Sequence, residues 1–367
     1  MMNLCELAPS FIRSIAPYQP GKPISELARE LGISESSIIK LASNENPLGV
    51  SPKAQKALMA AIPSLALYPD GNGFELKQAL CRHFSFEMDQ IVLGNGSNDV
   101  LELAARAFLT ANDSAVFSQH AFAVYPLVVQ AIGAHGIEVP AKDFGPDLDA
   151  MARAIRPDTK VVFLANPNNP TGTLSPAADL ERFISALPPH VLLVLDEAYN
   201  EYLQPQFRTD SVGWLKKYPH LLLTRTFSKV YGLAGLRVGY AVGRAEVADL
   251  LNRVRQPFNV NSLSLTAATA ALDDHDFVRR SYELNLAGMQ QLCEGIKALG
   301  LEWIPSFGNF VSVKVGDARA VNAALLAAGV IVRPIAGYGL PQWLRVSIGL
   351  ESENARFLQS LKQAIKA

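Results

Sequence analysis

The chain has 367 residues, of which 49% are hydrophobic and 18% charged, and its formal net charge is −1. This composition is typical of a folded protein with a large interior, and the length favours two domains. The balance of charge excludes a broad basic surface for nucleic acid or for an anionic membrane.

The N-terminal part is predicted to form an arm followed by a loop and two helices. Residues 1–40 contain a proline-containing arm and one short helix, and the polar segment Leu41–Gly49 (LASNENPLG) is predicted to be an extended loop. The predicted helices are Ile24–Leu31, Pro52–Ile62 and Phe74–Phe84, and the turn residues Tyr68–Gly73 separate the last two.

Short apolar runs alternate with helix-length segments between residues 41 and 272, which we expect to form one large domain. The predicted strands are Ile91–Leu93, Ala115–Ser118, Gly136–Val139, Val161–Ala165, Leu192–Leu195, Leu221–Arg225 and Val238–Val242. Because several runs are apolar at consecutive positions, both faces of the strands should be covered. This predicts a mainly parallel α/β sheet with helices on both faces, in which ligands bind at the carboxyl ends of the strands.

Residues 273–367 are predicted to form a smaller α+β domain. The long amphipathic stretch Asp276–Leu299 leads into it. Its predicted strands are Leu301–Ile304, Phe310–Val315, Ile331–Pro334 and Leu344–Ile348, and its predicted helices are Ala318–Ala328 and Ser352–Ala367.

The spacing of the cysteines, the N-terminal segment and one uncharged stretch together favour a cytoplasmic protein without a metal site. Cys5, Cys81 and Cys293 match no paired spacing of metal or redox sites, so we expect reduced thiols. Residues 1–20 lack the apolar core of an export signal. Ser114–Ile137 carries no charged side chain, but its glutamines, histidines and proline would be costly in lipid. A buried strand followed by a buried helix explains this stretch better.

The first polar motif, Gly94–Asp99 (GNGSND), lies between a predicted strand and the predicted helix Val100–Leu109. Its glycines permit a tight turn, and Ser97 or Asn98 would cap a helix whose free N–H groups attract an anion. A phosphate site and an ordinary capped turn both agree with this motif. A dinucleotide-binding fingerprint is disfavoured because Asp99 occupies the third glycine position.

Two further motifs end apolar strands. In Asn166–Gly172 (NPNNPTG), the amides of Asn166, Asn168 and Asn169 can face a ligand, although turn chemistry alone also accounts for such residues. Asp196 closes a very apolar strand, where a carboxylate is costly to bury unless a positive partner meets it. A protonated pyridine nitrogen, a metal or an arginine would serve, and the lack of a nearby His or Cys cluster in the sequence disfavours the metal.

The segment Thr224–Tyr240 (TRTFSKVYGLAGLRVGY) carries the strongest signal. Lys229 follows an apolar strand, and three glycines allow close approach of the backbone around it. A lysine that is removed from water beside other cations loses proton affinity and becomes a Schiff-base nucleophile. Thr226, Ser228 and Arg237 supply the hydroxyls and the guanidinium that suit a phosphate dianion.

Taken together, these motifs resemble the fold-type I pyridoxal 5′-phosphate (PLP) enzymes of the class I and II aminotransferase superfamily, and within it the histidinol-phosphate aminotransferase family. The matching segments run in order along nearly the whole chain: Ala16–Gly21, Ser43–Pro47, Tyr68–Asp70, Gly94–Asn98, Asn166–Gly172, Asp196–Tyr199, Thr226–Arg237 and Leu344–Val346. The resemblance implies PLP as the cofactor and the fold of these enzymes, with a mainly parallel central sheet and a smaller α+β domain.

The resemblance also implies roles for individual residues. Lys229 looks like the lysine that bears the cofactor and carries a proton between Cα and C4′. Asp196 would keep the pyridine nitrogen protonated, which strengthens the electron sink. Asn169 and Tyr199 would hydrogen-bond the ring oxygen O3′ and tune the acidity of the cofactor. The implied phosphate contacts are Ser97, Asn98, Thr226, Ser228 and Arg237.

Contacts beyond the cofactor core follow in the same way. Phe122 would stack on the pyridine ring, with Tyr125 as the alternative, and either residue would also suit a hydrophobic core. Tyr68 resembles the tyrosine that reaches the cofactor phosphate of a partner subunit, which implies a homodimer with shared sites. Arg345 is similar to the arginine that binds the distal anion of the substrate. Further implied substrate contacts are Tyr18, Asn46 and Arg333.

The substrates implied by the resemblance are an amino donor and a 2-oxo acid acceptor: L-histidinol phosphate and 2-oxoglutarate, which give imidazole acetol phosphate and L-glutamate in histidine biosynthesis. Aromatic amino-acid aminotransferases and threonine-phosphate decarboxylases share the cofactor motifs and remain alternatives. A non-catalytic PLP-fold module is the alternative from another class, and the retained lysine, aspartate and arginines argue against it. A nicotinamide dehydrogenase would give Lys229 no role.

Overall fold

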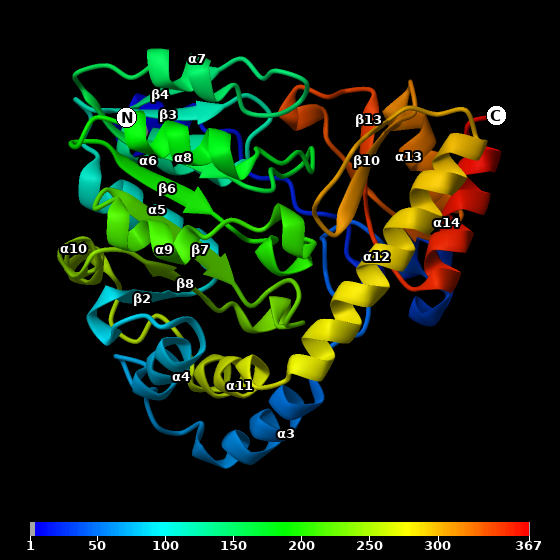
Figure 1. Cartoon of the computed structure of the whole chain (residues 1–367). Helices are drawn as coiled ribbons and strands as arrows, with labels where there is room; N and C mark the ends of the chain where they lie inside the picture. The colour runs from blue at the N-terminus through cyan, green and yellow to red at the C-terminus, as the bar shows by residue number, and fades with distance from the viewer. Residues whose placement is uncertain (1–3, 367) are drawn as a thin grey trace.

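The computed structural model describes residues 4–366. The first three residues of the predicted arm and Ala367, at which the predicted helix Ser352–Ala367 ends, lie outside the described residues. Two larger sheets carry the fold, and the long helix α12 (His275–Ala298) runs from the region of the first sheet to that of the second (Figure 1).

The first sheet has seven strands in the order β2-β8-β7-β6-β5-β3-β4. They are β2 (Ile91–Gly94), β3 (Ser114–Ser118), β4 (His135–Val139), β5 (Thr159–Ala165), β6 (Leu192–Asp196), β7 (Leu221–Thr226) and β8 (Gly239–Val242). Only β8 runs antiparallel to its neighbours β2 and β7, and the other pairs are parallel. The prediction of a mainly parallel α/β sheet is therefore confirmed.

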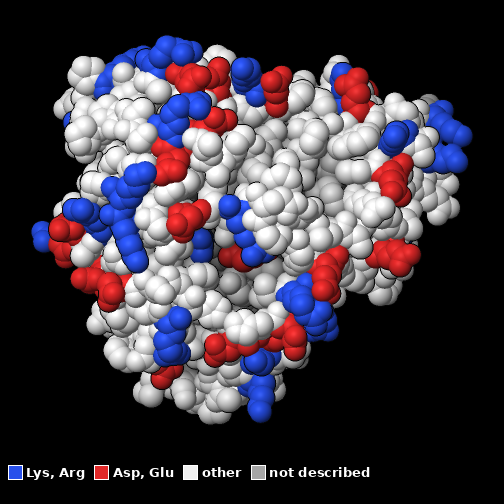
Figure 2. Space-filling model, in the orientation of Figure 1, with Lys and Arg blue, Asp and Glu red and all other residues white. Residues whose placement is uncertain are grey.

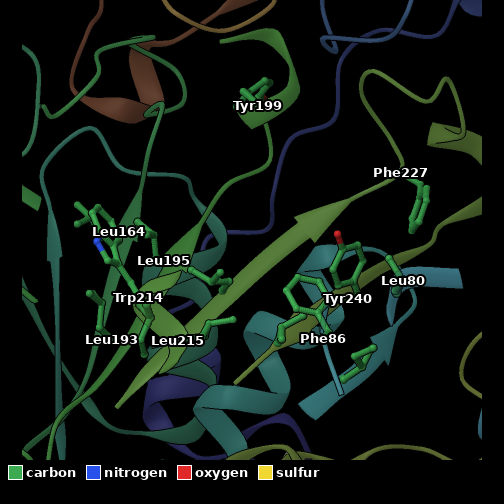
Figure 3. Close-up of a cluster of buried hydrophobic side chains, with 14 of the residues drawn as sticks. Leu80, Phe86, Leu164, Leu193, Leu195, Tyr199, Trp214, Leu215, Phe227 and Tyr240 are labelled. Carbon is green, nitrogen blue, oxygen red and sulfur yellow. The ribbon is translucent and has the colours of Figure 1, made fainter. Parts of the chain in front are cut away.

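Helices cover both faces of this sheet, as the consecutive apolar residues of its strands require. Leu193 and Leu195 of β6 pack in one core cluster, whereas Leu192 and Val194 pack in the other. Figure 3 shows part of the first cluster, in which Leu193 and Leu195 lie near Trp214 of α9 (Ser211–Lys217). The helices between the N-terminus and α12 are α1 (Ser10–Arg13), α2 (Ile24–Leu31), α3 (Pro52–Ala61), α4 (Phe74–Phe84), α5 (Ser97–Phe108), α6 (Val124–Ile132), α7 (Leu148–Arg153), α8 (Ala177–Ala186), α9 (Ser211–Lys217), α10 (Ala245–Val254) and α11 (Ser262–Leu272).

The second sheet has four strands in the order β12-β13-β10-β9, and all of its pairs are antiparallel. Its strands are β9 (Trp303–Ile304), β10 (Phe310–Lys314), β12 (Arg333–Pro334) and β13 (Trp343–Ser347). The helices α12, α13 (Ala318–Ala327) and α14 (Glu351–Ala364) pack with it around a core of their own. The expected boundary between residues 272 and 273 falls at the end of α11.

Two elements differ from the sequence-based expectation. The helix expected from Val100 begins at Ser97, because Gly96 takes the N-cap position with φ of 82° and neither Ser97 nor Asn98 is the cap. The strand expected over Ile331–Pro334 is divided into β11 (Val330–Ile331) and β12. β11 pairs with β1 (Ile39–Lys40), whereas β12 pairs with β13, so adjoining residues serve different sheets.

The surface carries both signs of charge. Lys and Arg side chains are interspersed with Asp and Glu side chains on the face shown in Figure 2, which agrees with the net charge of −1. Within residues 4–366, no helix combines the length and the apolar character needed to cross a membrane. The same residues contain no group of three or more His, Cys, Asp or Glu side chains placed to hold a metal ion.

Candidate active site

A cavity of about 240 Å³ opens at the carboxyl ends of β5, β6 and β7, beside β13 of the second sheet. Polar residues that directly follow neighbouring parallel strands meet at one edge of the sheet, which explains why separate motifs converge here. The structure brings together all the predicted site residues except Asn46 and Tyr68. Those that line the cavity are Tyr18, Ser97, Asn98, Phe122, Asn169, Asp196, Tyr199, Thr226, Ser228, Lys229, Arg237, Arg333 and Arg345.

Lys229 is half-buried and lies just after β7. Its Nζ donates a hydrogen bond to the backbone oxygen of Ser43 at 3.2 Å. Removal from water lowers the pKa of Lys229 to about 7, and the positive charge of Arg345 acts in the same direction. A substantial fraction of this amine is therefore unprotonated at neutral pH, the state in which a lysine acts as a nucleophile or a base.

Asp196 ends β6 and is 5% exposed. Its Oδ2 accepts a hydrogen bond from the Tyr125 hydroxyl at 3.0 Å, whereas Oδ1 is buried and has no hydrogen-bond partner among residues 4–366. Burial raises the pKa of Asp196 to about 6. The neighbouring arginine is not its partner, since Arg225 forms a buried ion pair with Glu197 at 2.8 Å. An orphaned carboxylate oxygen of this kind fits a cationic N–H donor such as a protonated pyridine nitrogen.

One end of the cavity gathers donors suited to a phosphate. The first turn of α5 starts at Ser97, and a side chain at Gly96 would collide with the guanidinium of Arg237. A side chain at Gly239 would collide with the backbone nitrogen of Ser97, so both glycines are needed for this close approach. Arg237 Nη1 donates to Ser228 Oγ at 3.2 Å. Helix N–H groups, hydroxyls and a guanidinium together are donors of the kind that bind anions.

At the opposite wall, Arg345 of β13 is buried and fixes the orientation of Asn169. Its Nη1 donates to Asn169 Oδ1 and its Nη2 to the backbone oxygen of Ala42, both at 2.6 Å. Because Oδ1 of Asn169 accepts from Arg345, the Nδ2 of that amide is available to donate into the cavity. The Nε of Arg345 is buried and has no partner in the described part of the chain.

Tyr199 lies on the same side of the cavity as the lysine. Its ring centroid is 5.7 Å from Lys229 Nζ, and its hydroxyl accepts a hydrogen bond from Asn44 Nδ2 at 2.9 Å. Burial raises the pKa of Tyr199 to about 12, so its hydroxyl keeps its proton at neutral pH.

The rim is formed by the N-terminal arm and β12. Arg333 Nη2 donates to the backbone oxygen of Gln19 at 2.6 Å, and its guanidinium lies 5.1 Å from the centroid of the Tyr18 ring. Phe122 lines the cavity and makes an edge-to-face contact with Tyr125.

The structure places Asn46 differently from the expected substrate contact. Its Nδ2 donates to the backbone oxygen of Val230 and to Ser281 Oγ, both at 2.8 Å, and the residue does not line the cavity. Asn44, two residues earlier, lines it instead. Asn44 has φ of 56°, which breaks the alternation of an extended segment, so spacing alone does not identify the asparagine that faces the site.

The three asparagines of the motif Asn166–Gly172 also have different roles. Asn166 Oδ1 accepts from the backbone nitrogen of Ser175 at 2.8 Å, and Asn168 Nδ2 donates to Thr171 Oγ1 at 2.8 Å. These two side chains hold the shape of the loop, and only Asn169 lines the cavity.

Tyr68 lies outside this cavity. It is 83% exposed, and its ring stacks on Phe258 with the centroids 4.9 Å apart.

Sequence reasoning missed the functional position of three residues. Tyr125, considered as a ring-stacking residue, is fully buried, stacks on Phe163 and holds Asp196 instead. Asn44 and Ser347 join Tyr199 in one hydrogen-bonded group, and Ser347 stands two positions after Arg345 on the same face of β13.

Comparison with known proteins agrees with this geometry. A family model described as aminotransferase class I and II matches residues 36–361. Histidinol-phosphate aminotransferase 2 of Nitrosospira multiformis is 62% identical over 366 residues, which cover 100% of this chain and 93% of that protein. Histidinol-phosphate aminotransferase of Methylobacillus flagellatus is 61% identical over 366 residues, which cover 100% and 99% of the two chains.

A solved structure is similar over almost the full length. It is the histidinol-phosphate aminotransferase from Sinorhizobium meliloti in complex with pyridoxal-5′-phosphate, with a TM-score of 0.88, 28% identity and coverage of 98% of both chains. The expected fold, that of the fold-type I PLP aminotransferases, is confirmed by this similarity. The chain therefore belongs to the family of class I and II aminotransferases, which use pyridoxal phosphate.

Proposed function

We propose that this aminotransferase transfers the amino group of L-histidinol phosphate to 2-oxoglutarate, which gives imidazole acetol phosphate and L-glutamate. The cavity that holds both the orphaned Oδ1 of Asp196 and the Lys229 amine of lowered pKa carries the proposal that PLP binds here. The choice of substrate is supported by relatives named histidinol-phosphate aminotransferase that are 57% to 62% identical over nearly the whole chain.

When bound, PLP supplies an electron sink that makes a proton on the carbon bearing the substrate's amino group acidic. Lys229 Nζ would be the base that holds and releases this proton, since its lowered pKa leaves it partly unprotonated. Asp196 Oδ1, which has no partner among the described residues, would accept a hydrogen bond from the ring nitrogen. Asn169 and Tyr199 would donate to the ring oxygen, and Phe122 would cover a face of the ring. Binding of the phosphate is assigned to Ser97, Asn98, Thr226, Ser228 and Arg237.

The substrate end of the cavity is cationic. Arg345 has a buried Nε without a partner among the described residues, and Arg333 lies at the rim with Tyr18. A guanidinium binds a phosphate ester and a carboxylate with the same planar set of donors, so one site serves the donor and the acceptor in turn. The two substrates would thus alternate in a ping-pong reaction.

A homodimer with shared sites is part of the proposal, as is a cytoplasmic location. Tyr68 is assigned to the phosphate of the partner subunit's cofactor. Its ring stacks on the exposed Phe258, and Leu67 beside it in the chain is exposed as well; exposed apolar side chains that adjoin in this way are typical of an interface. We also propose 1–40, 41–272 and 273–367 as the arm, the cofactor-binding domain and the small domain.

A panel of single substrates tests the proposed function. The purified enzyme is mixed separately with histidinol phosphate, phenylalanine and threonine phosphate, and the visible absorbance of the cofactor is followed. We expect histidinol phosphate to change the spectrum at the lowest concentration. A preference for phenylalanine would favour an aromatic aminotransferase, and carbon dioxide released from threonine phosphate would mark a decarboxylase. A cofactor spectrum that no amino donor changes would favour a non-catalytic module.

The variant Lys229→Ala tests the central residue. It should lose the absorbance band of the lysine-bound cofactor and nearly all turnover, because both depend on Nζ. Lys216→Ala, which alters an exposed lysine of α9, is the matched control and should keep both. Substantial residual transamination by Lys229→Ala would contradict the assignment.

A further inference from the structure

Three buried side chains connect the loop before α3, β13 and the tyrosine of the active site. Ser347 Oγ accepts a hydrogen bond from the backbone nitrogen of Asn44 at 2.7 Å. Ser347 Oγ and Asn44 Oδ1 are 3.0 Å apart, and Asn44 Nδ2 is 2.9 Å from the Tyr199 hydroxyl. The exposed fractions of Asn44, Ser347 and Tyr199 are 1%, 3% and 3%, so bulk water does not compete for these bonds.

The hydrogen bonds of this group run in one direction. The backbone N–H of Asn44 donates to Ser347 Oγ, and Ser347 Oγ donates its own proton to Asn44 Oδ1. An amide whose oxygen accepts from the serine presents its NH₂ group on the other side. Asn44 Nδ2 therefore donates to the Tyr199 hydroxyl, and the proton of that hydroxyl is left to point elsewhere.

We propose that Ser347 and Asn44 are positioning residues that force the Tyr199 hydroxyl to act as a hydrogen-bond donor into the cavity. This rests on the proposed function, in which Tyr199 donates to the ring oxygen of the cofactor. Arg345 orients Asn169 in the same sense, since it occupies the Oδ1 of that amide and leaves Nδ2 as a donor. The Tyr199 hydroxyl and Asn169 Nδ2 are thus both left to donate into the cavity.

The direction of these hydrogen bonds has a spectroscopic consequence. Two donors stabilise negative charge on the ring oxygen and so lower the pKa of the linkage between the cofactor and Lys229, which is read from visible absorbance as a function of pH. Loss of one hydrogen bond to a charged group corresponds to a rise of about 1 to 2 units in this pKa. Tyr199→Phe removes the donor and sets the reference shift.

Two variants change the hydrogen-bond relay, which runs from Ser347 through Asn44 to Tyr199, without removing the tyrosine. Ser347→Ala removes the group that fixes the amide, so a fraction of molecules turn Asn44 Oδ1 toward Tyr199, and the pKa should rise by less than in Tyr199→Phe. Asn44→Asp places an acceptor against Tyr199 and should raise the pKa by at least as much as Ser347→Ala does. In the Tyr199→Phe background, Ser347→Ala should cause no further rise, because the relay acts only through the hydroxyl.

Ser281→Ala is the matched control. It removes a buried hydroxyl that bonds Asn46 of the same loop but has no part in the relay, and it should leave the pKa unchanged. An equal shift in Ser281→Ala and Ser347→Ala would mean that loosening of the loop is the cause and would overturn the proposal. An equal shift by Ser347→Ala with tyrosine or phenylalanine at position 199 would also overturn it.

The outcomes separate this proposal from the one on which it rests. If Tyr199→Phe raises the pKa while Ser347→Ala and Asn44→Asp leave it unchanged, only the relay is wrong. If Tyr199→Phe itself leaves the pKa unchanged, Tyr199 does not reach the ring oxygen and both assignments fail. Ser347→Ala is a neutral, smaller replacement, so the test stands even if Asn44→Asp does not fold.

Discussion

Asp196→Asn is expected to separate stability from activity in the cofactor-free protein. Asp196 is buried at the end of β6, with one oxygen bonded to Tyr125 and the other without a partner in residues 4–366. Asparagine has the same shape and no charge. Its carbonyl oxygen can accept from Tyr125, and its NH₂ group can donate to the buried Thr224 hydroxyl beside the carboxylate, so the substitution removes the cost of burying a charge without leaving a gap.

The size of the effect follows from the pKa of Asp196. Burial raises it from 3.8 to about 6, which corresponds to about 3 kcal/mol. Because the folded state holds the proton more tightly than the unfolded state, the penalty is absent below pH 3.8 and complete above pH 6. We expect the cofactor-free variant to be more stable than the wild type by about 1 to 2 kcal/mol at pH 5 and by about 3 kcal/mol at pH 8.

Denaturant unfolding of the cofactor-free proteins at these two pH values measures the difference. Asp249→Asn, at an exposed position on α10, is the control and should change the free energy of unfolding by less than about 0.5 kcal/mol. With the cofactor present, Asp196→Asn should lose most of its activity because it no longer keeps the ring nitrogen protonated. A cofactor-free variant that is no more stable than the wild type at pH 8 would refute the reasoning.

Two further substitutions probe the buried arginines. Arg345→Lys removes the planar contacts to Asn169 and Ala42. Because one guanidinium is proposed to bind both substrates, kcat/KM should fall about 10-fold to 100-fold for the amino donor and for the 2-oxo acid. Steady-state kinetics that show a loss for only one of the two substrates would contradict a shared anion site. Glu197→Gln removes the buried carboxylate that pairs with Arg225. The free energy of unfolding, measured by denaturant titration, should therefore fall by about 3 kcal/mol. An unchanged free energy of unfolding would show that the ion pair adds no net stability.

Most of the first sheet was predictable because its strands are apolar at consecutive positions and end at polar motifs. The same logic located Asp196 and Lys229, since residues that follow neighbouring parallel strands must meet at one edge. The start of α5 was misjudged because the residue at its N-cap is Gly96, which has no side chain to mark the cap. In the sequence, such a glycine looks the same as a glycine in an ordinary turn.

The residues that escaped prediction are those whose role depends on contacts between distant segments. Asn44 and Asn46 look alike in the sequence, and only the left-handed backbone at Asn44 and its bond to Ser347, 303 positions away, turn it toward the site. Tyr125 is separated from Asp196 by 71 residues. No local pattern encodes such pairs, because they arise when the sheets assemble.

The backbone oxygens of Ala42 and Ser43 bind cations from different parts of the fold. Arg345 of the second sheet donates to Ala42, and Lys229 of the first donates to Ser43. The residues proposed to bind the substrate and to transfer the proton are thus both hydrogen-bonded to the same stretch of main chain. For an engineer who wishes to retarget the enzyme to another amino donor, a redesign at Arg345 therefore has to be optimised together with Leu41–Gly49. A new anion site that moves this loop is expected to move Lys229, the proposed proton acceptor, as well.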